Sequence, residues 1–162
     1  MNELPPWLKQ ATVWLLLALV LFLGVQAWLS HQQAARFVVQ GSTLEIRRAS
    51  DGHYHWPGRI NGRAVDFLVD TGATATAIPA ALARELGLPA VGSVQSSTAG
   101  GMVTGTVVVG DLALDGGVAV QRMRLTSLGG LSAPLLGMDV LGRLHLQQSD
   151  GVLRVDLAAA AR

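Results

Sequence analysis

The sequence predicts a mostly β protein: a single domain with one or two short helices, preceded by an N-terminal transmembrane helix. Short apolar runs alternate with Gly-containing turns about every eight to twelve residues, a spacing typical of an all-β barrel or sandwich. Residues 11–29 contain no charged side chain. A helix of that length spans about 28 Å, which matches the hydrocarbon core of a bilayer.

These patterns divide the chain into an N-terminal tail (1–10), the transmembrane helix (11–29), a polar linker (30–36), a folded domain (37–157) and a C-terminal tail (158–162). About 120 residues remain for the domain, enough for one hydrophobic core. The net charge of +1 and the charged fraction of 14% give no basic surface for nucleic acid, so we expect no nucleic-acid binding. The absence of cysteine excludes disulfides, thiolate chemistry and Cys-based zinc sites.

The apolar segment also has features of a cleaved secretory signal, which is the alternative to an uncleaved anchor. Trp14 and Trp28 lie near its two ends, where the indole ring favours the membrane interface. The run is long for a signal peptide and no Ala-x-Ala site follows it, although residues 25–27 are a tolerable substitute. We therefore favour an uncleaved anchor. Its orientation is not decided by the flanking charges, because basic residues stand on both sides of it.

A β-hairpin stands at the centre of the predicted domain. Residues 54–60 and 63–69 are strand-like, and the Asn-Gly pair between them is the strongest short-range hairpin signal, because both residues tolerate the positive φ of a type I′ turn. Asp70 ends the second arm of this hairpin. Downstream, residues 79–86 begin with Pro and are followed by Gly, which predicts a short helix.

Further strands are expected toward the C-terminus. Residues 93–98 and 102–109 enclose a Gly-rich tip, and 118–125 alternates Arg with Met and Leu, as in a half-buried strand. Residues 133–141 (APLLGMDVL) predict an apolar strand that runs into a Gly-hinged helix start, and 145–157 predict a final hairpin.

A pair of histidines precedes the central hairpin. His53 and His55 stand two residues apart and would share one face of a strand, so a metal pair is geometrically possible. Because no third ligand stands nearby in the sequence, we interpret both as surface histidines and expect no metal site.

Residues 67–74 (FLVDTGAT) carry the strongest functional signal in the chain. An aspartate at the end of a buried strand is costly to keep charged unless its charge is used, so Asp70 is a candidate site on physical grounds. Asp, Thr and Gly are also ordinary turn formers, and the triplet alone does not distinguish a site from a turn. The second motif, at residues 133–141, strengthens the functional interpretation, because two motifs in the right order are rarer than one.

Together the Asp-Thr-Gly-Ala turn and the later Leu-Leu-Gly segment resemble the retropepsin-like aspartic proteases, and most closely their membrane-anchored bacterial type. The resemblance covers roughly residues 42–157. It implies a single-domain retropepsin-like closed barrel, in which the turn and the later apolar segment cross beside each other under the active site.

The resemblance also implies roles for individual residues. Asp70 would be catalytic, and Thr71 and Gly72 would support it. The residues expected to bind substrate are Ala73, Ala99, Gly100 and Gly101. The last three would form the tip of a flap, a hairpin that closes over the substrate; a merely flexible hairpin tip is the alternative. No metal or cofactor is implied.

The proposed chemistry needs two carboxylates. Peptide hydrolysis requires one group to activate a water and another to protonate the carbonyl oxygen, and two aspartates that share one proton can do both. No other acid in the chain has an Asp-(Ser/Thr)-Gly context. We therefore expect the second carboxylate from Asp70 of another copy, in a homodimer with a two-fold axis. In retropepsins the chain ends form an intersubunit sheet, for which residues 152–157 are the natural candidate here.

The chain departs from the retroviral pattern at the expected dimer contacts. Met138 stands where retroviral proteases have an arginine, and residues 74–76 (Thr-Ala-Thr) replace its acidic partners. A dimer must therefore be held together differently. We assign Asp139 to the start of a helix over 140–144, where unpaired N–H groups favour a carboxylate, rather than to catalysis.

The expected function is that of a membrane-anchored homodimeric aspartic endopeptidase, which hydrolyses peptide bonds with a water activated by the paired Asp70 carboxylates. By resemblance to anchored relatives, it would be a single-pass protein of the bacterial inner membrane whose domain lies in the periplasm and cleaves proteins or peptides. Two alternatives remain: a non-catalytic binding or assembly module that retains the fold, and a glycosidase-like enzyme. The intact Asp70 turn favours the endopeptidase.

Overall fold

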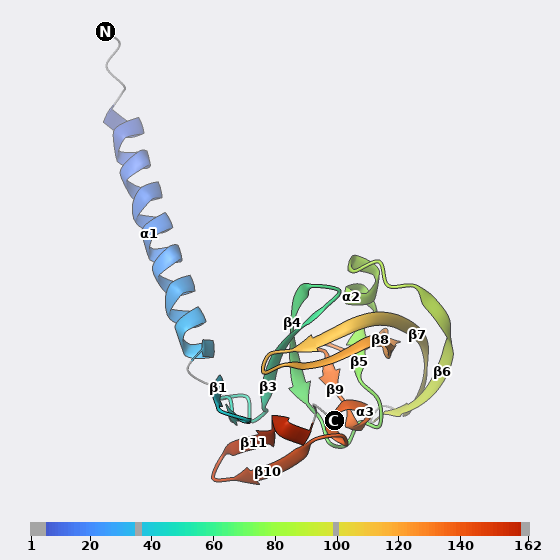
Figure 1. Ribbon diagram of the computed structural model, residues 1–162. Coiled ribbons are helices and arrows are strands. Elements are labelled where there is room, and N and C mark those ends of the chain that lie inside the picture. Colours follow the sequence, from blue (N-terminus) through green and yellow to red (C-terminus); the bar gives the residue numbers. More distant parts are fainter. Residues whose placement is uncertain (1–5, 35–36, 99–100, 160–162) are drawn as a thin grey trace. The chain divides into compact units, whose positions relative to one another are not determined.

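The computed structural model describes residues 6–34, 37–98 and 101–159, which belong to two compact units, Met1–Arg36 and Phe37–Arg162. The first unit contains one described element, helix α1 (Pro6–Ala34), coloured blue in Figure 1. Leu and Ala, which favour helices, make up much of it, and Pro6 stands at its first position, where no N–H is needed. The helix continues through Ala34, into the segment expected to be a linker.

The side chains of α1 are described at Trp7 and over residues 10–26, and the large apolar ones among them are exposed. Helix α1 includes the whole of residues 11–29, the segment predicted to be a transmembrane helix. Within the described residues, no helix combines the length and the hydropathy that a membrane span needs. The structure thus does not confirm that α1 crosses a membrane.

The second unit begins and ends in a four-stranded antiparallel sheet. In spatial order its strands are β1 (Phe37–Gln40), β2 (Thr43–Arg47), β11 (Val152–Asp156) and β10 (His145–Ser149). Strands β10 and β11 form the predicted final hairpin, and its turn residues Asp150 and Gly151 have positive φ angles of 51° and 73°. The alternate residues Leu153 and Val155 of β11 are buried, so one face of this sheet packs against the core.

Strand β11 lies inside this sheet, which corrects the prediction that residues 152–157 pair with a second copy. Leu153 stands opposite Ile46 of β2 on one side and Gln148 of β10 on the other. A strand with both edges occupied has no free backbone groups for another chain. The prediction failed because nothing local in the sequence shows that β2, near the start of the domain, supplies the neighbouring strand. The outer strands of the sheet are β1 and β10.

The larger sheet contains seven strands and surrounds most of the core (Figure 1). In spatial order they are β3 (His55–Ile60), β4 (Arg63–Val69), β9 (Leu135–Leu136), β5 (Ala77–Pro79), β8 (Val118–Leu128), β7 (Gly101–Leu114) and β6 (Ala90–Thr98). Strand β3 also pairs with β7, where Gly58 is required because a Cβ would lie 2.7 Å from Ala113 O. The domain is mostly β, as predicted, but its strands form two sheets, and the single closed barrel is not confirmed.

Two short α-helices, α2 (Ala80–Glu85) and α3 (Met138–Leu141), and a 3₁₀ turn at Leu157–Ala159 lie in the described part of the domain. Helix α2 was predicted over a slightly longer range (79–86). The second helix was predicted over 140–144, but α3 begins two residues earlier, directly after Gly137, and ends at Leu141. The turn between β3 and β4 has the positive φ angles of type I′, 48° at Asn61 and 82° at Gly62. This turn sets the register of the hairpin and so places Trp56 opposite Phe67, with both side chains fully buried.

Candidate active site

Asp70 follows directly after β4, at the point where a second strand, β9, pairs with it. Strands β4 and β9 run parallel, with Val69 opposite Leu136. The N–H of Asp70 donates to Leu136 O at 3.0 Å, and the N–H of Leu68 donates to Pro134 O at 2.9 Å. The two motifs therefore lie side by side, and their pairing fixes the backbone on which the half-buried Asp70 side chain stands.

The turn after Asp70 is held by a short set of hydrogen bonds. The backbone N–H of Gly72 donates to Asp70 Oδ1 at 2.9 Å, and that of Ala73 donates to Asp70 O at 3.2 Å. A Cβ on Gly72 would lie 3.2 Å from Oδ1, so a larger residue would crowd the carboxylate. Among the described residues Oδ2 has no hydrogen-bond partner. The carboxylate is thus held by one oxygen and presents the other, while Thr71 beside it is exposed.

A second set of bonds fixes the far end of the turn to α3. The fully buried Thr76 donates its hydroxyl to Asp139 Oδ1 at 2.7 Å and its backbone N–H to Asp139 Oδ2 at 2.9 Å. Its hydroxyl accepts the N–H of Gly137 at 3.1 Å. A Cβ on Gly137 would lie 2.5 Å from the carbonyl carbon of Ala75, so only glycine fits.

Asp139 therefore has a structural role, as predicted, but with a partner that the sequence analysis missed. Its Oδ1 accepts the N–H of Val140 at 3.0 Å, which fits the expected place at the start of the helix. Its two bonds to Thr76 join residues 63 positions apart. No local signal in the sequence indicates this pairing.

The expected flap hairpin is present, but its tip lies largely outside the described residues. Strands β6 and β7 pair antiparallel up to Thr98 opposite Gly101. Ala99 and Gly100 fall outside the described residues, and Gly101 begins β7 with a φ of 105°. The hairpin agrees with the sequence prediction, whereas the substrate-binding role of its tip stays a prediction.

His53 and His55 belong to an ion-pair cluster on the surface of β3 and β4. The ring of His55 lies between two carboxylates, with Nδ1 2.7 Å from Asp66 Oδ2 and Nε2 2.8 Å from Asp51 Oδ2. The backbone N–H of His53 and the ring of His55 lower the pKa of Asp51 to about 2. Burial disfavours a charged His55 ring, but its bonds to Asp51 and Asp66 outweigh this effect and raise its pKa. Both ring nitrogens are thus engaged, and the described residues contain no cluster suited to a metal.

An Asp-Thr-Gly turn at the end of one strand, which is paired with a second strand and bonded to a short helix, is typical of the retropepsin-like class of aspartic protease folds. The chain belongs to the gag-polyprotein putative aspartyl protease family, whose model matches residues 56–143. This range includes Asp70, the β6–β7 hairpin and α3, and it excludes α1 and the four-stranded sheet.

One of the solved structures compared with the chain shows the same fold. A retropepsin-like aspartic protease from Rickettsia conorii is 22% identical, with a TM-score of 0.57 over 70% of this chain and 89% of that chain. The protease of Simian Foamy Virus (mac) is 18% identical, with a TM-score of 0.41 over 54% of this chain and 91% of that chain. No curated protein matches the sequence.

Proposed function

We propose that the protein is a homodimeric aspartic endopeptidase, in which the Asp70 carboxylates of two copies activate a water for attack on a peptide bond. The observation that carries this proposal is the state of Asp70: one oxygen is held by Gly72, and the other has no partner in the described part of the chain. A carboxylate oriented by one oxygen and open at the other can bind a water and accept its proton.

The second carboxylate is expected from another copy, because Asp70 alone among the acids of the sequence stands in an Asp-(Ser/Thr)-Gly context, and several of the others are bonded elsewhere. Asp139 is bonded to Thr76 and Glu45 to Arg154. Asp51 and Asp66 share the ring of His55. None of these carboxylates follows a strand into a turn like that of Asp70. A two-fold axis beside the exposed Thr71 would bring two Asp70 side chains together, so that one serves as base and the other as acid.

The dimer would be held by contacts other than those of retroviral proteases. Strand β11 has no free edge, so a shared sheet would have to form along β1 or β10. Next to the turn, Met138 donates its N–H to Ala73 O at 2.8 Å, and its side chain is 40% exposed. We assign to Met138 an apolar contact with the second copy, in place of the absent arginine ion pair.

Substrate would lie across the paired turns. Ala73 would line the cleft, and the hairpin tip at Ala99, Gly100 and Gly101 would close over the peptide backbone. The preferred substrate is a protein or peptide in an extended conformation, because a hairpin that closes over the cleft leaves room for a single chain.

We further propose that α1 anchors the domain to the bacterial inner membrane, with the domain in the periplasm. The uncharged segment Ala11–Leu29 and the exposed apolar side chains of α1 support this assignment. Membrane fractionation with carbonate extraction tests it, together with a reporter joined after Arg162. Release by carbonate, or a reporter active only in the cytoplasm, would contradict the anchor.

Cleavage of a mixed peptide library by the purified chain tests the proposed activity. Wild type should cleave and be inhibited by a transition-state mimic such as pepstatin, and Asp70→Asn should be inactive because it removes the base at unchanged size. A folded wild-type protein that cleaves nothing would favour a binding or assembly module that retains the fold.

A further inference from the structure

Strand β8 has one unpaired edge over its first half. It pairs with β7 from Val118 onward, but its neighbour on the other side, β5, reaches only the stretch from Thr126 to Leu128. The N–H of Thr126 donates to Thr76 O on the β5 side. Because alternate residues of a strand point their N–H groups to the same side, Arg124 N–H faces the unpaired edge. No strand of the described chain occupies that edge before Thr126.

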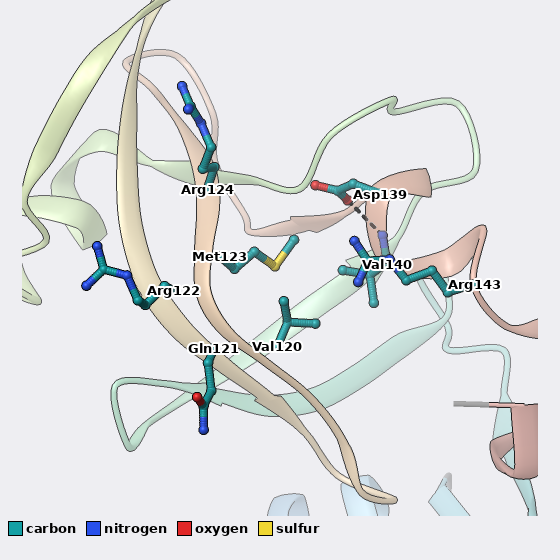
Figure 2. Close-up of a pocket in the computed structure, with 8 residues that line it drawn as sticks. All are labelled: Val120, Gln121, Arg122, Met123, Arg124, Asp139, Val140 and Arg143. Carbon is teal, nitrogen blue, oxygen red and sulfur yellow. Dashed lines mark hydrogen bonds between the residues drawn. The ribbon is translucent and has the colours of Figure 1, made fainter. Parts of the chain in front are cut away.

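A pocket of roughly 300 Å³ lies against this edge, between β8 and α3 (Figure 2). Val120, Met123 and Val140 form its apolar part, and Figure 2 shows Met123 pointing from the strand toward α3. Its volume is at the lower limit of ligand pockets. The pocket therefore suits one or two side chains of a bound segment rather than a large ligand.

Three exposed arginines stand at this pocket: Arg122, Arg124 and Arg143. None of their side chains has a hydrogen bond or an ion pair with another described residue. The carboxylate of Asp139, which also lines the pocket, is already bonded to Thr76 and Val140. The surface beside the pocket thus carries positive charge that has no partner in the described chain, and this charge attracts an anionic group.

The strand presents different chemistry on its two faces. Arg122, which has a φ of 49° at a shift in the register between β7 and β8, and Arg124 are both exposed, whereas Met123 is buried, so the outer face of β8 is cationic and the inner face is apolar. A peptide that extended the sheet along this edge would alternate its side chains between the same two faces. Its acidic side chains would lie beside the arginines, and its apolar ones would enter the pocket beside Met123.

We propose that the open edge of β8 is an exosite, which binds by strand addition an extended segment with alternating acidic and apolar residues. One part of this inference rests on the proposed function, namely that the bound segment belongs to a protein substrate. Helix α3, on the other side of the pocket, is bonded to the Asp70 turn through Asp139 and Met138. The exosite would therefore hold substrate at the element that supports the active-site turn, and should lower KM without changing kcat.

The test measures fluorescence anisotropy of a labelled peptide in which Glu and Val alternate, added to the full chain in detergent micelles. The protein carries Asp70→Asn so that the probe is not cleaved. We expect binding that weakens as salt is raised, and that falls about fivefold with Arg122→Gln or Arg124→Gln. Arg84→Gln, an exposed arginine on α2, is the matched control and should bind as the parent does. A melting curve for each variant verifies that the fold is kept.

A second probe tests the backbone contacts without changing the protein. Methylation of alternate backbone nitrogens of the peptide removes the donors that strand addition needs, so it should abolish binding. The exosite would be overturned if the methylated peptide, or a peptide with Lys in place of Glu, bound as tightly as the parent peptide. It would also be overturned if both arginine variants bound the parent peptide as tightly as the parent protein does. The arginines would then only protect an exposed edge from aggregation. Because binding is measured on inactive protein, loss of the exosite would not contradict the proposed peptidase activity. Conversely, a wild-type protein that binds the peptide normally but cleaves no substrate would contradict the peptidase activity and leave the exosite in place.

Discussion

The turn that carries Asp70 and the open edge of β8 differ in how many of their polar groups are hydrogen-bonded within the described chain. In the turn, Thr76 is fully buried and makes three hydrogen bonds to the segment from Gly137 to Asp139. At the edge, Arg124 stands beside a pocket, and its side chain has no partner in the described chain. Long-range hydrogen bonds therefore fix the Asp70 turn within a single chain, while the edge of β8 keeps groups that the described part of the chain does not bond.

The largest loss of stability is expected when one carbon is added at Gly137, beside the Asp70 turn. In Gly137→Ala the new Cβ would meet the backbone of Ala75 at 2.5 Å. We expect a loss of about 3 kcal/mol or more in the free energy of unfolding, measured by urea denaturation, because backbone atoms cannot move aside as a side chain can. Gly130→Ala, where a Cβ meets nothing within 4 Å, is the control and should be nearly neutral. Equal stability of the two variants would show that the turn is less tightly packed than it appears here.

A smaller effect is expected when only the hydroxyl of the buried threonine is removed. Thr76→Val keeps the shape but leaves Asp139 Oδ1 with one donor fewer and Gly137 N–H without its acceptor. We expect a loss of about 1–3 kcal/mol in stability. Thr76→Ser restores the hydroxyl and should recover most of this loss in the same urea experiment. A Val variant as stable as wild type would mean that the bonds to Asp139 do not hold the turn.

A substitution at the tip of the β6–β7 hairpin should lower kcat and leave the stability of the fold nearly unchanged. Gly101 has a φ of 105°, which a β-branched residue rarely adopts, and it lies at the exposed end of β7. We expect Gly101→Val to lower kcat about tenfold through a misplaced flap while the melting temperature changes little. The neighbouring Met102→Leu is the control. Unchanged kcat in a folded Gly101→Val protein would remove the flap assignment.

The smallest effect concerns the surface cluster around His55, and it depends on pH. The pKa of Asp51 is lowered to about 2 from 3.8, so its contribution to stability is present above pH 3.8 and is lost as the pH falls toward 2. The pKa of His55 is raised above 6.5, so its contribution is present below pH 6.5 and is lost as the pH rises through the raised value. His55→Ala should therefore lower the melting temperature most between about pH 4 and 6.5, by about 2 °C, as for exposed ion pairs. A larger effect at pH 9 than at pH 5 would contradict this account.

Much of this architecture could be predicted from the sequence, because local signals carry it. The Asn-Gly turn sets the register of β3 and β4, and the apolar run before Asp70 ends where the strand ends. The bond between Thr76 and Asp139 and the pairing of β11 with β2 could not be predicted. They join residues far apart in the sequence, and only the packed fold brings them together. The open edge of β8 was missed for the same reason, since it depends on where β5 stops.

The central claim is that two chains share one active site through their Asp70 side chains. Wild type and Asp70→Asn, unfolded together and refolded in varying ratios at constant total concentration, test it directly. If each active site needs two aspartates, heterodimers are inactive and the cleavage rate follows the square of the wild-type fraction. Sedimentation of the same samples verifies that the total amount of dimer is constant. A rate that falls in simple proportion to the wild-type fraction would show that each chain acts alone, and would contradict the shared dyad.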